Sequence, residues 1–88
     1  MPRYYFHTDD GRSFHDEDGT VLADDQAARI EASRVLGQLV NEHPQDIWHD
    51  EPFRMTVTDD VGLVVFILDI AAIASPSLSR PPVAKPGA

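Results

Sequence analysis

The sequence predicts an α+β domain in which an antiparallel sheet of three to four strands carries one helix on one face. Residues 3–15 combine aromatic and β-favouring types around an Asp-Gly turn. Residues 53–58 alternate in polarity, and a second turn joins them to a mainly apolar run at residues 63–69. Between them, residues 25–41 have helical periodicity. We expect one domain over residues 1–74. Residues 75–88 hold four of the seven prolines, which predicts a disordered tail.

The first segment is interpreted as a β-hairpin that turns at Gly11. A two-residue loop would set Phe14 opposite His7. A three-residue loop with Gly11 in the left-handed conformation would set Phe14 opposite Phe6. We favour the second register because it gathers both phenylalanines on one face. It also makes His7 and His15 diagonal neighbours on the other face, with β-carbons roughly 7–8 Å apart.

The middle segment is interpreted as one helix that follows an Asp-rich turn at residues 16–19. Asp24 is a suitable N-cap, because its carboxylate can accept from the free amides of the first turn. The helix should end near Asn41, since His43 precedes a proline and avoids helical geometry. Its core-facing stripe consists of Ala28, Ala32, Val35, Leu36 and Leu39.

The third segment is interpreted as a second hairpin, with strands at residues 53–58 and 63–69 and a four-residue loop between them. Pairing Thr58 with Leu63 gives one face that is entirely apolar and must meet the helix. That face holds Phe53, Met55, Val57, Val64, Phe66 and Leu68.

The opposite face of the sheet is unusual because it is half apolar. A sheet covered on one side by a helix normally has a polar free face, yet this hairpin places Leu63, Val65 and Ile67 there. Two explanations are open. The first, which we favour, is that a second copy or a partner covers the face. The second is that residues 70–73, together with the Trp48 loop, fold back over it. The candidate interface residues are Tyr5, Leu63, Val65, Ile67 and, on the outer helix surface, Ile30.

The charge is concentrated in the predicted domain. All 15 acidic residues but only five of the seven basic residues lie at or before Asp69, so this part carries −10 and the tail carries +2. Such a charge repels nucleic acids and anionic membrane surfaces. The chain also has no cysteine and no apolar run of about 18 residues. We expect a cytoplasmic protein with a protein partner, and neither a nucleic-acid nor a membrane role.

Several short motifs in order along residues 1–69 resemble a known family. They are Met-Pro-Arg-Tyr-Tyr-Phe-His at residues 1–7, Asp10-Gly11, Asp16-Glu17-Asp18-Gly19, Leu22-Ala23-Asp24 with Ala27-Ala28-Arg29, Glu31 and Ala32 behind it, and Val57-Thr58-Asp59 ahead of Gly62. The chain resembles short bacterial proteins of unknown function that open Met-Pro-Arg-Tyr-Phe-Phe-His. It departs from them at Tyr5 and in its tail. The resemblance implies the same element order, and it implies no activity or catalytic residue.

The histidines offer the best candidate for a metal site. His7 and His15 share a predicted face and Asp16 and Glu17 follow, so two imidazoles and a carboxylate could bind a transition metal. The spacing matches no known ligand motif, and a polar sheet face explains the same residues. The Asp-rich turns lack the EF-hand pattern. No nucleophile elbow or phosphate loop is present, so the sequence predicts no catalytic residue and no cofactor.

These observations favour a non-catalytic protein-interaction module that forms a homodimer through the free sheet face. Two alternatives come from other classes: a small transition-metal-binding protein that uses His7 and His15, and an acidic inhibitor that mimics nucleic acid and binds a basic partner. In the tail, residues 79–82 could form a polyproline II ligand, but an inert extension is the preferred interpretation.

Overall fold

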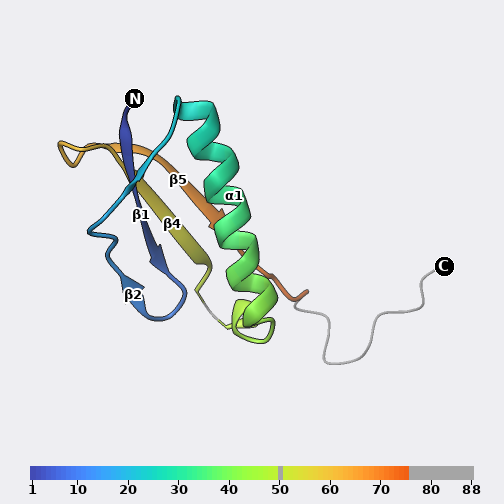
Figure 1. The fold of residues 1–88 in the computed structure, drawn as a ribbon. Helices are drawn as coiled ribbons and strands as arrows, with labels where there is room; N and C mark the ends of the chain where they lie inside the picture. The colour runs from blue at the N-terminus through green and yellow to red at the C-terminus, as the bar shows by residue number, and fades with distance from the viewer. Residues whose placement is uncertain (50, 76–88) are drawn as a thin grey trace.

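The computed structural model describes residues 1–49 and 51–75, and the predicted tail therefore lies almost wholly outside the described residues. Its elements are β1 (Arg3–Asp9), β2 (Ser13–Phe14), β3 (Thr20–Val21), α1 (Asp25–Glu42), a 3-10 turn (Asp46–Trp48), β4 (Phe53–Thr58) and β5 (Val64–Ile70). The strands form one antiparallel sheet in the order β2-β1-β4-β5. The short strand β3 also pairs with β1, at Arg3 and Tyr4, whereas β2 pairs with it at Thr8 and Asp9. Helix α1 crosses one face of this sheet (Figure 1), which confirms the predicted α+β class.

Helix α1 begins and ends close to the predicted residues. The Asp24 carboxylate accepts a hydrogen bond of 2.9 Å from the Ala27 amide, as expected for an N-cap. At the other end, the His43 amide donates to the Leu39 carbonyl. The predicted stripe faces the sheet: Ala28, Ala32 and Leu36 are fully buried, and Val35 and Leu39 are half-buried. Two alanines in this stripe let the helix lie close to the strands.

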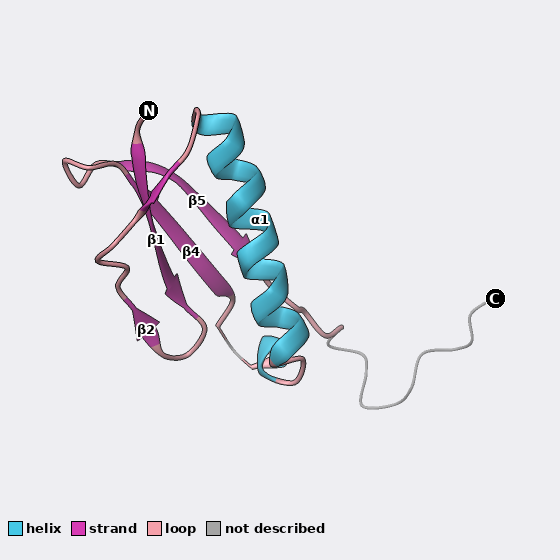
Figure 2. Cartoon of the chain, viewed as in Figure 1, coloured by secondary structure: helices cyan, strands magenta, loops and turns pink. Residues whose placement is uncertain are grey.

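The core lies between α1 and the inner face of β1 and β4 (Figure 2). Strand β4 has neighbours on both sides and the helix above it, so Phe53, Met55 and Val57 are almost wholly removed from water. The Tyr4 ring is buried in the same layer, and its hydroxyl donates a 2.6 Å hydrogen bond to Asp25 at the start of α1. That bond, followed by burial and the nearby carboxylates, raises the pKa of Tyr4 to about 12.

The favoured register of the first hairpin is wrong by two residues. Phe14 lies opposite Thr8, and Ser13 lies opposite Asp9. The loop does have three residues with Gly11 at a φ of +100°, as predicted, but it spans residues 10–12 because the Asp9 carboxylate accepts from the Gly11 amide. Phe14 still shares the inner face with Phe6, yet it is 60% exposed and lines an open groove together with Val35 and Leu39 of α1.

The second hairpin also departs from its predicted register, again by two residues over most of its length. Thr58 pairs with Val64, and after that pair Val65 is an extra residue, so Val57 pairs with Phe66. This is a β-bulge. The connecting loop covers residues 59–63, because the Asp59 carboxylate accepts from the amides of Val61 and Leu63. Since the shift is even, the inner face keeps Phe66 and Leu68, gains Ile70 and leaves Val64 exposed.

Candidate functional site

Two of the four histidines, His7 and His15, lie in a groove of about 430 Å³ on the outer face of β1. Strand β1 provides Tyr5 and His7, and the chain after β2 provides His15 and Asp16. The opposite wall is Thr58 with the loop between β4 and β5. Extending the observed register of β2 by one residue sets His15 directly opposite His7, one step nearer than the predicted diagonal. The two rings stack with centroids 4.2 Å apart.

Both nitrogens of His7 are held by neighbours. Its Nδ1 accepts a 3.1 Å hydrogen bond from the Asp16 amide, so the ring proton lies on Nε2, which is 3.0 Å from the Thr58 hydroxyl. This arrangement requires a neutral imidazole. Burial and then the charge of His15 lower the pKa of His7, and the Asp16 carboxylate opposes them only in part.

Asp16 fastens the following turn to β1. One oxygen of its carboxylate accepts from the Phe6 amide at 3.1 Å, and the other accepts from the amides of Asp18 and Gly19, also at 3.1 Å. Burial acts to raise the pKa of this carboxyl group, but the three amide donors and His7 outweigh it and hold the pKa below its ordinary value. Asp16 therefore acts as an internal acceptor.

We call residues 15–19 the strap, because they cross the outer face of β1. The strap lies so close to the strand that a Cβ atom on Gly19 would be 2.9 Å from both Arg3 Cγ and Tyr5 Cε2. Gly19 also has a φ of +71°, which favours glycine. The Arg3 guanidinium donates to the Asp18 carbonyl at 2.9 Å and closes the arrangement. Part of the free sheet face is thus covered from within the chain.

The structure brings the predicted metal candidates together but leaves His7 without an available nitrogen. A metal ion at His7 would have to displace either the Asp16 amide or the Thr58 hydroxyl. Among residues 1–49 and 51–75, no group of three or more His, Asp or Glu side chains could hold a metal ion. Metal binding at His7 and His15 stays a prediction, and this geometry does not favour it. The same two hydrogen bonds occupy the sites that His7 would need for proton transfer.

The predicted interface residues fall into two groups. Leu63, just before β5, is 65% exposed, and Ile67, on β5, is 52% exposed. Val65 at the bulge is half-buried. Tyr5 is half-buried beneath the strap. Ile30 is exposed on α1, in the other layer of the domain. The structure therefore leaves Leu63 and Ile67 exposed beside or on β5 but packs Val65 against the core. Tyr5 lies under the strap and Ile30 in the other layer.

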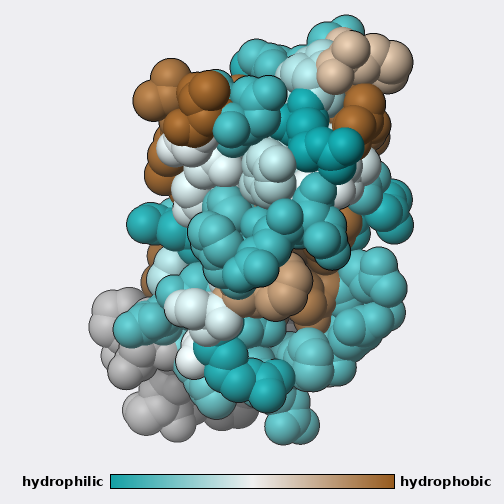
Figure 3. Space-filling view, turned by 60° about the vertical axis from the view of Figure 1, so that its left-hand side comes forward, coloured by the Kyte–Doolittle hydropathy of each residue, from teal (hydrophilic) through white to brown (hydrophobic). Residues whose placement is uncertain are grey.

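The largest exposed side chains of the two segments proposed to cover the free sheet face are not buried against it. Trp48 is 64% exposed and Ile73 is 87% exposed. Ile70 lies on the inner face, packed against the core. The face drawn in Figure 3 is mainly hydrophilic, with hydrophobic side chains in separate patches. No helix in the described part of the chain is long and apolar enough to cross a membrane.

The sequence model of one protein family, described as Domain of unknown function (DUF6894), matches residues 3–71. The chain belongs to this family. The match extends over every helix and strand of the DUF6894 domain, from β1 to β5, and includes the strap. No curated protein and no solved structure matches the chain.

Sequence reasoning missed the parts of the DUF6894 domain that join distant segments. It interpreted Asp16 as one residue of an acidic turn, whereas its carboxylate reaches Phe6 in β1. The available signal was the spacing of Asp16 and Gly19, which suits an Asx-type turn with a left-handed last residue. The exposure of β5 at the sheet edge was also missed, because no sequence pattern fixed the strand order.

We expect the stability of the DUF6894 domain to decrease between pH 7 and pH 5. The folded state lowers the pKa of His7 below its ordinary value of 6.5, so the unfolded chain takes up this proton first. The free energy of unfolding is therefore highest above pH 6.5, where His7 is neutral in both states. It decreases as the pH falls from 6.5 toward the pKa of folded His7. Urea unfolding at a series of pH values measures this dependence.

The His7→Gln variant should have a flatter pH profile over this range than the unaltered chain. His49 is exposed, so His49→Gln serves as the matched control and should keep the original slope. Equal slopes for His7→Gln and the unaltered chain would contradict this assignment. A second decrease in the free energy of unfolding should begin below about pH 4. There the unfolded chain takes up a proton at Asp16 more readily than the folded state, in which the pKa of this carboxyl group is lowered.

Proposed function

We propose that this DUF6894 domain is a non-catalytic protein-interaction module that assembles through the β5 side of its sheet. The observation that carries the proposal is the exposure of large aliphatic side chains there: Leu63, Val64 and Ile67 are 65%, 57% and 52% exposed. Exposed aliphatic residues gathered at one edge of a sheet in this way can mark a protein interface.

The charge distribution supports an interface at this place. The domain is strongly acidic, which opposes close association over most of its surface. The outer face beside β5 is different, because Arg54 donates two hydrogen bonds of 2.8 and 2.9 Å to the Asp69 carboxylate. This pair cancels its own charge. The apolar side chains of β5 thus lie next to an ion pair whose two charges compensate each other.

The histidine groove supports a non-catalytic role for the same domain. His7 and Asp16 are its two best candidates for acid–base chemistry. Both already form hydrogen bonds with backbone amides, and His7 also bonds the Thr58 hydroxyl. A general base needs a free nitrogen or oxygen directed at a substrate. The contacts of this groove hold the strap in place, so we assign the groove a structural role.

A second copy of the chain is the partner that we propose. Light scattering at several micromolar concentrations should give the mass of a dimer for the full chain. The Ile67→Lys variant should raise the dimer dissociation constant at least tenfold, because it places a charge in an apolar contact worth more than about 1.4 kcal/mol. Its own folding should be unaffected, since Ile67 is exposed in the single chain.

The matched control is Val21→Lys, which alters an exposed aliphatic residue of β3 on the opposite side of the sheet. This variant should keep the dissociation constant of the unaltered chain. A monomeric mass for the unaltered chain over the whole concentration range would refute self-association. Equal weakening by both lysine variants would show that the β5 surface has no special role in assembly, because added positive charge by itself should favour association of two acidic copies.

A further inference from the structure

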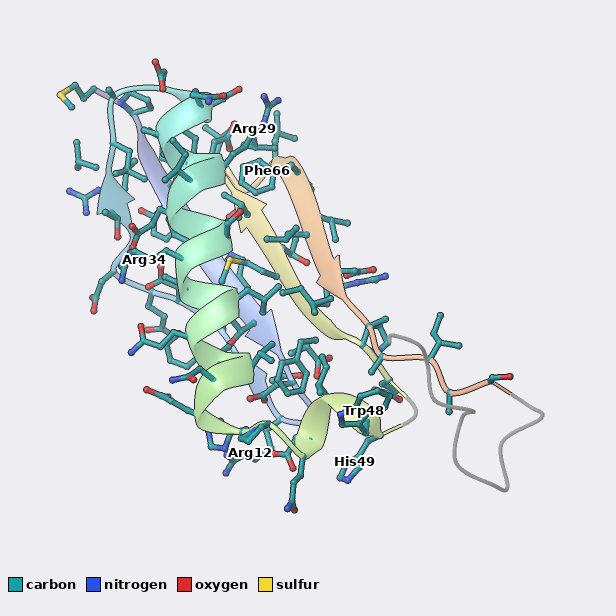
Figure 4. The ribbon with its side chains drawn as sticks, turned by 90° about the vertical axis from the view of Figure 1, so that its right-hand side faces the viewer. Arg12, Arg29, Arg34, Trp48, His49 and Phe66 are labelled. Carbon is teal, nitrogen blue, oxygen red and sulfur yellow. The ribbon has the colours of Figure 1, made fainter. Side chains whose placement is uncertain are left out.

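Strand β5 forms an open edge of the sheet. In the described part of the chain it pairs only with β4, which leaves every second backbone amide and carbonyl from Val64 to Ile70 directed away from the sheet. Unpaired edge groups of this kind are a template for another strand. Figure 4 shows β5 as the outermost strand on its side of the domain.

The two edges of the sheet differ in a way that indicates a use for β5. On the far side, β1 is covered by β2 and β3, which have two residues each and are separated by the strap. Short, interrupted edge strands are a usual protection against unwanted pairing. β5 has seven residues, and from Phe66 to Ile70 it contains no proline, lysine or bulge. Its only charged residue in that stretch, Asp69, is neutralised by Arg54.

A hollow of about 290 Å³ runs beside this edge, between α1 and β5. The strand side is formed by Phe66, Ile67 and Leu68, and the helix side by Arg29 and Ser33. In Figure 4 the Arg29 side chain lies beside Phe66. Further along α1, Gly37 has no neighbouring atom within 4 Å of where a Cβ would be. Small helix residues beside the strand leave room for side chains of an adjoining molecule.

We infer that the occupant of this edge is β5 of a second copy, paired antiparallel so that two sheets join into one and both α1 helices lie on the same face. This inference rests on the proposed function and makes it more specific. Antiparallel pairing of a strand with itself is two-fold symmetric, so one surface serves both copies. The charge beside this edge also favours a second acidic copy. Arg29 has no ion-pair partner in the described part of the chain, so its positive charge lowers the negative charge on this side of the domain.

The position of α1 distinguishes this arrangement from a dimer formed through the free sheet faces. In the edge-paired dimer the two helices lie over one continuous sheet, about three strand spacings of 4.8 Å apart. In a face-to-face dimer they lie on opposite outer sides, separated by two sheets about 10 Å apart and by a helix layer of about 10 Å on each. The distance between the outer surfaces of the two helices therefore distinguishes the edge-paired dimer from the face-to-face dimer.

Pulsed electron paramagnetic resonance on the full chain measures that distance. The chain has no cysteine, so Arg34→Cys provides a single nitroxide site, exposed on the outer surface of α1. We expect a distance below about 30 Å in the edge-paired dimer, against more than about 40 Å in a face-to-face dimer. As a control, Ser13→Cys in β2 should give more than about 30 Å, because seven strand spacings separate the two copies of β2.

The outcomes separate the two proposals. A dimer with a short Arg34→Cys distance and a long Ser13→Cys distance supports edge pairing. A dimer with a long Arg34→Cys distance overturns edge pairing but leaves the interaction module in place. A chain that light scattering finds monomeric at the labelling concentration overturns both. Loss of the surface pair between Arg34 and Glu31 has little effect on folding, so the variant remains interpretable.

Discussion

Replacing Gly19 by alanine is expected to lower the free energy of unfolding by about 2–4 kcal/mol. Two effects add. An alanine at a φ of +71° has an unfavourable backbone conformation that costs about 1–2 kcal/mol. Its methyl group would also lie 2.9 Å from Arg3 Cγ and from the Tyr5 ring, and neither atom is the free end of a flexible side chain. The strap would have to move away from β1. Urea unfolding followed by circular dichroism measures the change.

Gly11→Ala and Gly62→Ala are the matched controls for this prediction. Both glycines have a positive φ, at +100° and +87°, but neither has any atom within 4 Å of the site of a Cβ. These variants should therefore show only the backbone effect, about 1–2 kcal/mol. If all three variants lose the same stability, the close contact of the strap with β1 has no energetic role.

Removing the carboxylate of Asp16 should destabilise the domain by a similar amount. Asp16→Ala leaves the amides of Phe6, Asp18 and Gly19 without their acceptor. Hydrogen bonds to a charged group contribute about 1.5–3 kcal/mol each, and solvent can restore those of the exposed turn, so we expect a loss of about 2–4 kcal/mol. The acid-dependent decrease below about pH 4 should shrink in the same variant, because one protected carboxylate has been removed.

Glu17→Ala is the control for this change, since Glu17 is the exposed neighbour of Asp16 in the same acidic turn. It should alter the free energy of unfolding by no more than about 0.5 kcal/mol. The Asp16→Asn variant should have a free energy of unfolding between those of Asp16→Ala and Glu17→Ala, because it keeps one acceptor oxygen but replaces the other by an amide donor. A loss of stability from Glu17→Ala equal to that from Asp16→Ala would point to the charge of the turn instead of its hydrogen bonds.

The sequence predicted those elements that depend on local physics. The cap at Asp24, the end of α1 near His43 and the buried stripe around Leu36 follow from residues within a few positions of one another. The inner faces of the strands were also predicted except at Val64, beside the bulge, because alternation within a strand decides which residues share a face. This is why an error of two residues in both hairpins left Phe66 on the inner face.

The registers themselves could not be predicted, because single side chains set them. The carboxylates of Asp9 and Asp59 bond the amides of their own turns and decide which residues form each loop. In the histidine groove, the sequence predicted that His7 and His15 would share one face as diagonal neighbours. It could not show that the Asp16 amide and Thr58 occupy the His7 nitrogens, since those contacts depend on how the strap and the second hairpin lie against β1.

The position of β1 at the centre of the sheet has a consequence for how the chain folds. β1 forms its longest ladder with β4, where Phe6 pairs with Val57 about fifty residues later. Contacts of such long sequence separation slow folding, because a large loop must close before they form. During synthesis the edge of β1 that pairs with β4 therefore stays open until the second hairpin has left the ribosome. A chaperone would therefore have most to protect in the interval between synthesis of β1 and synthesis of β4, when this strand edge is unpaired.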